Sequence, residues 1–143
     1  MKKIFTLLFL MAFTMTTANA ICWVEICDKY YLDTDSIQYY VNDRGETEYD
    51  KCSYWTKILN DNSSYYKRLE KRYQKKIWYT MCKVVLNIKN KRSATKSEIG
   101  YDLHRNYIYN FEYNDYSLEW DSLIPGSNGE YINDIVMKRL GRR

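Results

Sequence analysis

Four cysteines are the residues of this 143-residue chain whose chemistry is easiest to predict: Cys22, Cys27, Cys52 and Cys82. In an exported chain, an even number of cysteines indicates two disulfides. The alternative is a zinc site, but no pair has the C-x-x-C spacing of zinc ligands, and His104 is the single histidine. We therefore predict two disulfides and no metal ligand.

The sequence leaves three disulfide pairings open. A straight strand from Cys22 to Cys27 would separate their Cα atoms by about 16 Å, whereas a disulfide spans about 4.4–6.8 Å. A bond between these two cysteines therefore requires a turn. We prefer a bond of Cys52 with Cys82, or a crossed pairing.

The other candidate groups do not form a recognisable catalytic set. As a general base, His104 would need a nucleophile and an orienting partner. Asp102 is nearby, but no G-x-S-x-G or similar motif is present. Asp33 and Asp35 resemble a carboxylate pair, yet they belong to a cluster that favours a tight turn, and glycosidase carboxyls face each other across a cleft. We predict a protein that is not an enzyme and uses no cofactor.

One predicted helix carries a cluster of basic residues. The cluster is Lys67, Arg68, Lys71, Arg72, Lys75 and Lys76. It is the best candidate for a polyanion patch that would hold a heparan-like sugar, nucleic acid or a lipid headgroup. A solvated helix face that keeps the protein soluble explains the same pattern, and we favour that interpretation. Without Lys2 and Lys3 the chain has 20 basic and 18 acidic residues, a balance of only +2, so we expect no nucleic-acid partner.

Sixteen tyrosines make the chain unusually aromatic. Tyr107, Tyr109, Phe111 and Tyr113 alternate along one predicted strand and would line one of its faces. This face is either core beneath the last helix or an exposed aromatic surface for a partner. We favour core, because the apolar stripe of the last helix needs such a surface to pack against.

Periodicity of two, interrupted by turn residues, predicts strands joined as an antiparallel meander. We expect strands at 22–26, 30–32, 37–41, 47–59, 76–88, 93–101 and 107–113, with turns at 33–36, 42–45, 90–92 and 102–104. Helical spacing of Tyr66, Leu69 and Tyr73 predicts a helix over 63–75, between two strands.

The end of the chain predicts a second helix. Ser127 and Glu130 fit the capping box, in which the serine accepts an early NH and the glutamate reaches back to the serine NH. The apolar residues that follow have helical spacing: Ile132, Ile135, Val136 and Leu140. Because this helix has one apolar stripe, it must dock on a sheet face, and we predict an α+β fold.

The first twenty residues predict a signal peptide over 1–20. Lys2 and Lys3 precede the apolar run Ile4–Phe13, and Ala18-Asn19-Ala20 supplies an A-x-A cleavage site. The run is shorter than the roughly 20 residues that span a bilayer. We therefore expect one exported domain at 21–143. No lipobox precedes Cys22.

The order of several features resembles the surface-adhesin protein E-like domain family of Gram-negative exported proteins. The matching residues are Trp23, Tyr31, Asp33, Ser36, Trp55, Tyr101, Asp102, Trp120, Pro125, Ser127 and Glu130. The resemblance implies a curved antiparallel sheet of about six strands with the C-terminal helix packed on its concave face. It also implies a location in the periplasm or on the cell surface, a host matrix protein such as laminin or vitronectin as partner, and homodimer formation.

The sequence differs from this family in two respects. The family's adhesin is lipid-anchored, whereas no lipobox is visible here. The family helix often carries a cysteine that ties it to the sheet, whereas Val136 or Met137 stands at the nearest position, so the helix must dock by packing alone. The alternative function is therefore a periplasmic structural or accessory module without a host ligand.

Overall fold

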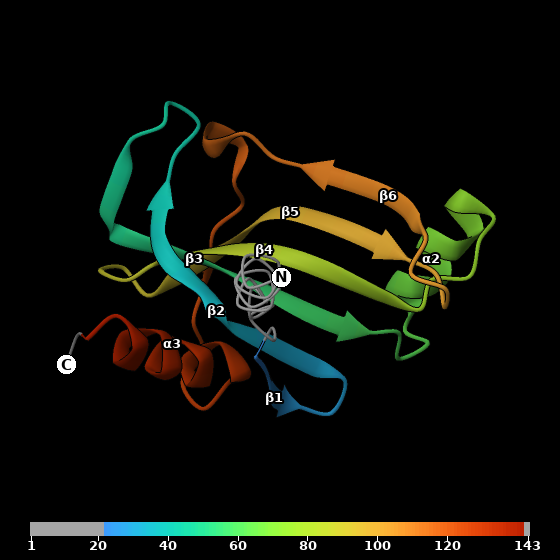
Figure 1. Ribbon diagram of the computed structural model, residues 1–143, viewed down its shortest axis with the longest axis horizontal. Coiled ribbons are helices and arrows are strands. Elements are labelled where there is room, and N and C mark those ends of the chain that lie inside the picture. Colours follow the sequence, from blue (N-terminus) through green and yellow to red (C-terminus); the bar gives the residue numbers. More distant parts are fainter. Residues whose placement is uncertain (1–21, 142–143) are drawn as a thin grey trace, which may run out of the picture.

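The structure is a computed structural model that describes residues 22–141, so the predicted signal peptide lies outside the described residues. Within them, one antiparallel sheet carries two α-helices (Figure 1). The strands are β1 (Trp23–Cys27), β2 (Tyr30–Val41), β3 (Thr47–Leu59), β4 (Tyr79–Asn87), β5 (Arg92–Tyr101), β6 (Tyr107–Glu112) and β7 (Asp121–Ser122). The helices are α2 (Ser64–Tyr73), the 3₁₀ turn η1 (Asp115–Ser117) and α3 (Asn128–Arg139).

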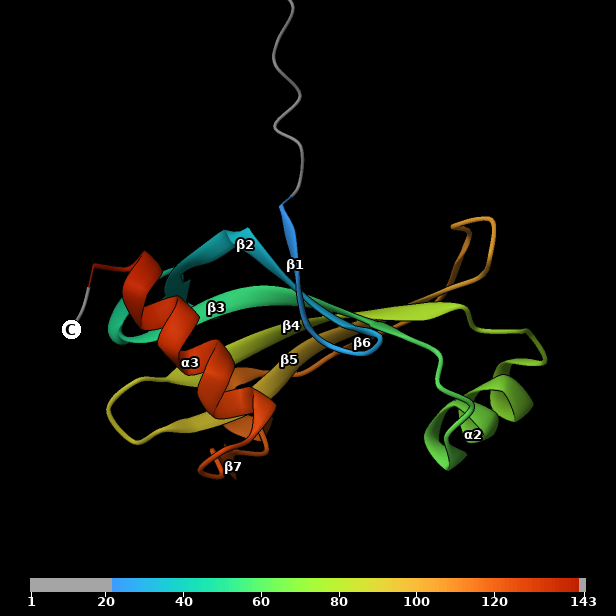
Figure 2. The same cartoon turned by 90° about the horizontal axis from the view of Figure 1, so that it is seen from below.

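The strands lie in the sheet in their order along the chain, β1 to β6, and β7 pairs with β5 beyond the end of β6. This is the predicted meander, and the α+β fold is confirmed. The sheet is curled, and both helices lie against its concave face, α3 at one end of the strands and α2 at the other (Figure 2). No helix among residues 22–141 combines the length and apolarity that a membrane span requires.

The predicted turn at 33–36 is wrong, because β2 runs through it as one bent strand. Asp33 Oδ1 accepts the NH of Asp35 at 3.1 Å, and Ser36 Oγ donates to the carbonyl of Asp33 at 2.7 Å. Ser36 Oγ also accepts the NH of Trp55 in β3 at 2.8 Å. The pairing register shifts between Asp33 and Gln38. The turn-type hydrogen bonds therefore form, but they build a bulge.

Packing is the main contact of α3 with the sheet, but it does not act alone as predicted, because Arg139 pairs with Asp35 at 3.2 Å and the Asn128 amide donates to Cys27 Sγ at 3.1 Å. Ile132 and Val136 are fully buried in a core with Leu32, Tyr54 and Leu86. This core lies where α3 crosses β1 and β2. Burial of two branched side chains accounts for the docking, at about 1.5–3 kcal/mol each.

Only one of the two hydrogen bonds of the predicted capping box forms at the N-terminus of α3. Ser127 Oγ accepts the NH of Glu130 at 3.3 Å, as expected. The Glu130 carboxylate, however, accepts the NH of Gly126 at 2.7 Å. The NH of Ser127 is already bonded to the carbonyl of Ile124 at 3.0 Å, so Glu130 orders the preceding loop instead.

Only the middle of the predicted aromatic face is core, and it lies under α2 and not under the last helix. Tyr109 is buried with Leu69 and Ile77, and its ring stacks on Tyr73 at 4.8 Å between centroids. Tyr107 and Tyr113, at the two ends of this face, are exposed. The predicted packing against the last helix was wrong because that helix packs at the opposite end of the strands.

The predicted disulfides are absent, and no bond joins the four cysteines at 22, 27, 52 and 82 within the described chain. The preferred bond of Cys52 with Cys82 is wrong because of the strand register. Cys52 lies opposite Leu86 and Cys82 opposite Thr56, which separates the two cysteines by four residues, or about 13 Å along the strands. Both are buried and fill the core. Burial, followed by the charge of Glu98, raises the pKa of the Cys82 thiol to about 12.

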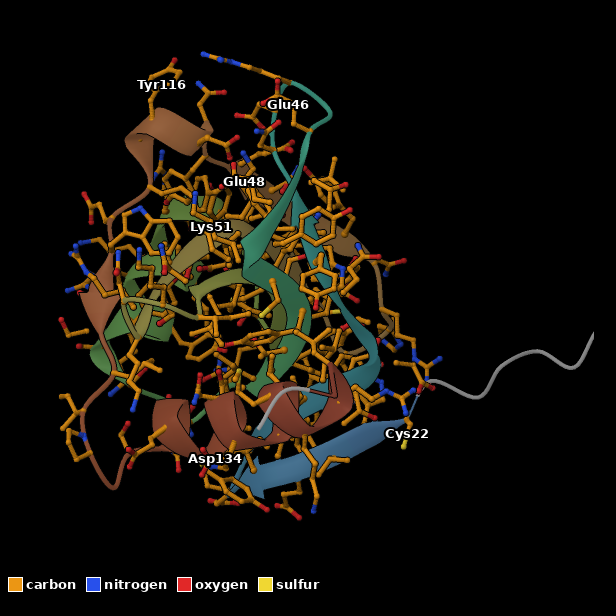
Figure 3. All side chains as sticks on the ribbon, turned by 90° about the vertical axis from the view of Figure 1, so that its left-hand side faces the viewer. Cys22, Glu46, Glu48, Lys51, Tyr116 and Asp134 are labelled. Carbon is orange, nitrogen blue, oxygen red and sulfur yellow. The ribbon has the colours of Figure 1, made fainter. Side chains whose placement is uncertain are left out.

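Four residues lock the β2–β3 hairpin onto η1, and we call Tyr40, Asp43, Lys96 and Asp115 the carboxylate clamp. Lys96 Nζ donates to Asp43 at 2.6 Å and to Asp115 at 2.9 Å, and the Tyr40 hydroxyl donates to Asp115. The backbone NH groups of Asp43 and Asp115 bond to each other's carboxylates. In Figure 3, Glu46 of the hairpin and Tyr116 of η1 mark this end of the molecule. The clamp joins two segments more than 70 residues apart.

The clamp shifts the titration of its own members. Burial disfavours the charged form of Lys96, but the hydrogen bonds to Asp43 and Asp115 outweigh it and raise its pKa. The hydrogen bond from Lys96 lowers the pKa of Asp43. For Asp115, burial acts the other way, but the bonds from Tyr40 and Lys96 prevail and lower its pKa. The charged forms are therefore the stable ones in the folded protein.

Candidate binding surface at the α2 end

Helix α2 buries one side and presents four residues of the basic cluster on the other, while Lys75 and Lys76 follow the end of the helix at Tyr73. Tyr66 and Leu69 face the core. All six predicted cluster residues are exposed: Lys67, Arg68, Lys71, Arg72, Lys75 and Lys76. The structure therefore brings the predicted patch together on a single surface.

Most of this charge is not neutralised by the protein. Lys76 pairs with Glu70 at 3.1 Å, and the Arg72 guanidinium lies 5.6 Å from the ring centroids of Tyr73 and Phe111. The other four members, at positions 67, 68, 71 and 75, form no ion pair within residues 22–141. Their charges are available to a partner in solution.

Glu70 organises the loops around α2 and does not offset the outer cations. Its Oε1 accepts the side-chain amide of Asn60 at 3.0 Å and the NH of Ile77 at 3.1 Å. Asn60 Nδ2 also donates to the carbonyl of Ile77 at 2.8 Å. Gln74 ends the helix in the left-handed conformation, with φ of 52°. The side chains of Asn60 and Glu70 thus hold the backbone that follows the helix at Ile77.

Trp78 is exposed at this end of the molecule and was not among the predicted site residues. Its NH donates to the carbonyl of Tyr101 at 2.8 Å, and its carbonyl accepts the NH of Asn60 at 2.9 Å. The backbone is therefore fixed between two neighbouring segments, while the indole is 49% exposed. A rigid backbone beneath an open ring is an arrangement suited to stacking a ligand.

Two hollows flank Trp78. One, of about 280 Å³, is lined by Lys29, Leu59, Asn60, Asn62, Lys76, Ile77 and Trp78. The other, of about 460 Å³, is lined by Lys75, Lys76, Trp78, Asp102, Leu103 and His104. The lining residues come from the end of β3 and from four connections that meet at the end of the sheet beside α2, on the right in Figures 1 and 2.

The turn after β5 supplies one wall, and its geometry confirms that His104 lies on a surface turn. Asp102 Oδ1 accepts the NH groups of His104 and Asn106, both at 2.8 Å, and its Oδ2 accepts the Asn106 amide at 2.9 Å. The bonds from Asn106, and then from His104, lower the pKa of Asp102. Its carboxylate is therefore charged and committed to shaping the turn. Residues 22–141 contain no cluster of His, Cys, Asp or Glu suited to a metal ion.

Several of the family-pattern residues lie on the sheet face away from the helices. Trp23 is paired with Asp33, which is paired with Trp55. Lys57 Nζ lies 4.8 Å from the ring centroid of Trp23 and 5.2 Å from that of Tyr31. Lys57 of β3 thus makes cation–π contacts with one ring in β1 and one in β2, which link three strands at the β1 edge of the sheet.

The remaining pattern residues have local structural roles. Tyr101 stacks on Tyr79 at 5.0 Å. The carbonyl of Trp120 accepts the Arg92 guanidinium. Pro125 lies in the loop that leads to α3, before the cap formed by Ser127 and Glu130. Of the whole pattern, only Asp102 borders a hollow at the α2 end.

A third hollow, of about 310 Å³, has the opposite charge. It is lined by Tyr65, Thr95, Glu98, Tyr113, Ser117, Glu119 and Asp121. Glu98 Oε1 accepts the hydroxyls of Tyr109, at 2.6 Å, and of Tyr65. Its three carboxylates disfavour an anion, so an acidic partner would be directed to the outer side of α2.

Comparison with known proteins finds similarity in three dimensions alone. No family model matches the sequence, and no curated protein matches it. Solved structures of Haemophilus influenzae protein E do match. One crystal form superimposes with a TM-score of 0.56 at 18% identity, over 84% of this chain and 90% of that one. A second structure gives 0.53 at 16% over 90% of each chain, and a third, from a non-typeable strain, gives 0.55 at 15% over 87% and 81%.

At this level of identity the match establishes the fold. It extends over nearly the whole described chain, as the sequence resemblance implied. The sheet, the intervening helix and the C-terminal helix of this protein together form the fold of protein E.

Proposed function

We propose that this chain is an exported, non-enzymatic binding domain that holds an acidic macromolecular partner at its α2 end. The observation that carries the proposal is the exposed, unpaired charge of Lys67, Arg68, Lys71 and Lys75 beside the open indole of Trp78. A solvated helix face would explain the lysines alone. It would not explain a fixed aromatic ring with a hollow on each side.

The rigidity of the surface supports this proposal. Tyr66 donates to the carbonyl of Ile58 at 2.9 Å and is within 3.0 Å of Thr80 Oγ1, so α2 is anchored to two strands. The cations therefore sit on a preformed scaffold, and a partner does not have to pay for ordering the helix. Cations clustered in this way also speed association with an oppositely charged partner.

The protein E fold supports an adhesin-like role at the cell surface, with a host matrix protein as the partner. The alternative is a periplasmic accessory module without a host ligand. Protease treatment of intact cells distinguishes the two. Rapid loss of the protein would support the adhesin, and protection until the outer membrane is permeabilised would support the accessory module.

Heparin chromatography tests the α2 surface. Changing Lys67, Arg68, Lys71 and Arg72 together to Ser should abolish retention on the column. The matched control changes four exposed basic residues elsewhere to Ser: Arg44, Lys89, Lys91 and Lys138. Both variants lose the same formal charge, so earlier elution of both by the same amount would indicate a net-charge effect and contradict the proposal.

A further inference from the structure

We propose that Trp78 is the stacking platform of a sugar subsite, and that the ligand of the α2 end is an anionic polysaccharide. This inference rests on the proposed function and deepens it by naming the ligand class. Trp78 separates two hollows of about 280 and 460 Å³, and its ring is half-exposed between them. An indole face binds the apolar face of a sugar ring, and the hollows leave room for neighbouring units of the chain.

Lysines surround the platform on both sides. Lys29 and Lys76 border the smaller hollow, and Lys75 and Lys76 border the larger. The Lys76 side chain is 70% exposed despite its contact with Glu70, and neither Lys29 nor Lys75 has an ion pair within the described chain. These ammonium groups would receive carboxylate or sulfate substituents of the sugar.

A neutral side chain favours a sugar over a nucleic-acid backbone. Asn62 lines the smaller hollow, and its side-chain amide has no hydrogen bond within residues 22–141. The amide offers both a donor and an acceptor. A sugar hydroxyl can bond to either, whereas a phosphodiester has only acceptors and leaves the amide oxygen without a partner.

The basic cluster extends the subsite along one direction. Lys67 and Lys71 are four residues apart and lie on one side of α2. Lys75 follows the end of the helix and borders the larger hollow, so it lies between the platform and the helical cations in the sequence. The ten-residue helix is about 15 Å long. A polymer could thus place one ring on Trp78 and further anionic groups along the helix, which favours a polysaccharide over a single sugar.

The test compares two anionic polymers on the folded protein. Binding of a heparin-derived octasaccharide and of inorganic polyphosphate is measured by calorimetry for the wild type, Trp78→Ala and Trp78→Phe. We expect Trp78→Ala to weaken octasaccharide binding about tenfold, the loss expected for one aromatic stacking contact. Polyphosphate binding should change less than about twofold, and Trp78→Phe should retain most octasaccharide affinity.

Control variants separate failure of this inference from failure of the proposed function. Tyr116→Ala removes an aromatic ring that is 89% exposed at the far end of the molecule and should change neither affinity. The α2 quadruple Ser variant should weaken both polymers. If Trp78→Ala leaves octasaccharide binding unchanged, or weakens polyphosphate binding equally, the sugar subsite is wrong while the basic surface stands. If the quadruple variant binds both polymers normally, the proposed function is wrong as well.

Discussion

The two ends of the sheet use charge in opposite ways. At the α3 end, Lys96 is buried between Asp43 and Asp115, with 8% of its side chain exposed. At the α2 end, Lys67 and Lys71 project from a helix into solvent without an ion pair in the described chain. A buried, fully paired cation holds two segments together and has nothing left for a ligand. Exposed, unpaired cations contribute little to stability and remain available for binding.

The hydrophobic contacts of the two helices follow the same division. α3 is anchored by Ile132 and Val136 and is capped by Ser127. α2 buries Tyr66 and Leu69, but Ser63 at its N-terminus makes no side-chain cap. We infer that α3 completes the core, whereas α2 presents a surface. The first two predictions below are measured as both stability and heparin retention, because the comparison requires the two to change independently.

The largest expected effect is at the α3 end. Ile132→Ala removes a side chain that is 1% exposed, and we expect the free energy of unfolding to fall by about 2–5 kcal/mol, the range for such cavities. Urea denaturation measures this loss. Under native conditions, heparin elution of the folded fraction should not change.

The exposed position Lys71 at the α2 end is the matched comparison. Lys71→Ala should change the free energy of unfolding by less than about 0.5 kcal/mol and should bring heparin elution forward. If Ile132→Ala alters elution as strongly as Lys71→Ala does, the division between a structural end and a binding end is wrong.

The second-largest expected loss of stability is at the carboxylate clamp. Lys96→Met keeps the length of the side chain but leaves two carboxylates without their cation. We expect the free energy of unfolding to fall by about 2–3 kcal/mol, as for a hydrogen bond to a charged group whose partner is left unsatisfied. Unchanged urea stability would show that the hairpin and η1 are held by other contacts.

Low pH should remove the contribution of the carboxylate clamp to the free energy of unfolding. The folded-state pKa values of Asp43 and Asp115 are lowered, so their contribution is complete above the unfolded value of about 3.9. It disappears as the pH falls through the lower folded values. The stability difference between the wild type and Lys96→Met should therefore shrink between pH 5 and pH 2, as measured by urea denaturation.

The acid titration has an internal control at the α2 end. Hydrogen bonds also lower the pKa of Asp61 and of Asp102, and neither carboxylate contacts Lys96. Their contribution is the same in the wild type and in Lys96→Met, so it cancels in the difference. A difference that stays constant throughout this pH range would contradict the assignment of the charge pairs.

Local periodicity explains why the fold could be predicted from the sequence. The strands and the stripe of Ile132 and Val136 repeat at spacings that a single segment reveals. The bend in β2 could not be predicted, because Asp33 and Ser36 form similar hydrogen bonds in a turn and in a bulge. The decisive bond comes from the NH of Trp55, about twenty residues later. The disulfide prediction failed because strand register, which places Cys52 and Cys82 apart, is not visible in cysteine spacing.

The candidate site, like the fold, could be predicted only where its residues lie close together in the sequence. The basic cluster was found because its members share one helix and its C-terminal extension. Trp78, Lys29 and His104 were not assigned to a site, because three separate connections bring them together. The one local signal was a tryptophan directly after two lysines and an isoleucine. The burial of Lys96 could not be predicted, because the strand that contains it has a polar sequence.

The smallest expected effect is at the helix caps. Ser127→Ala removes the acceptor for the NH of Glu130, and we expect a loss of about 1 kcal/mol in the free energy of unfolding. Ser63→Ala should cost less, because the Ser63 side chain makes no cap hydrogen bond to α2. Thermal unfolding of the two single variants, compared at one scan rate, measures the difference. Equal losses would mean that the two helices depend on their caps to the same degree, and that α2 is as much a part of the structural framework as α3.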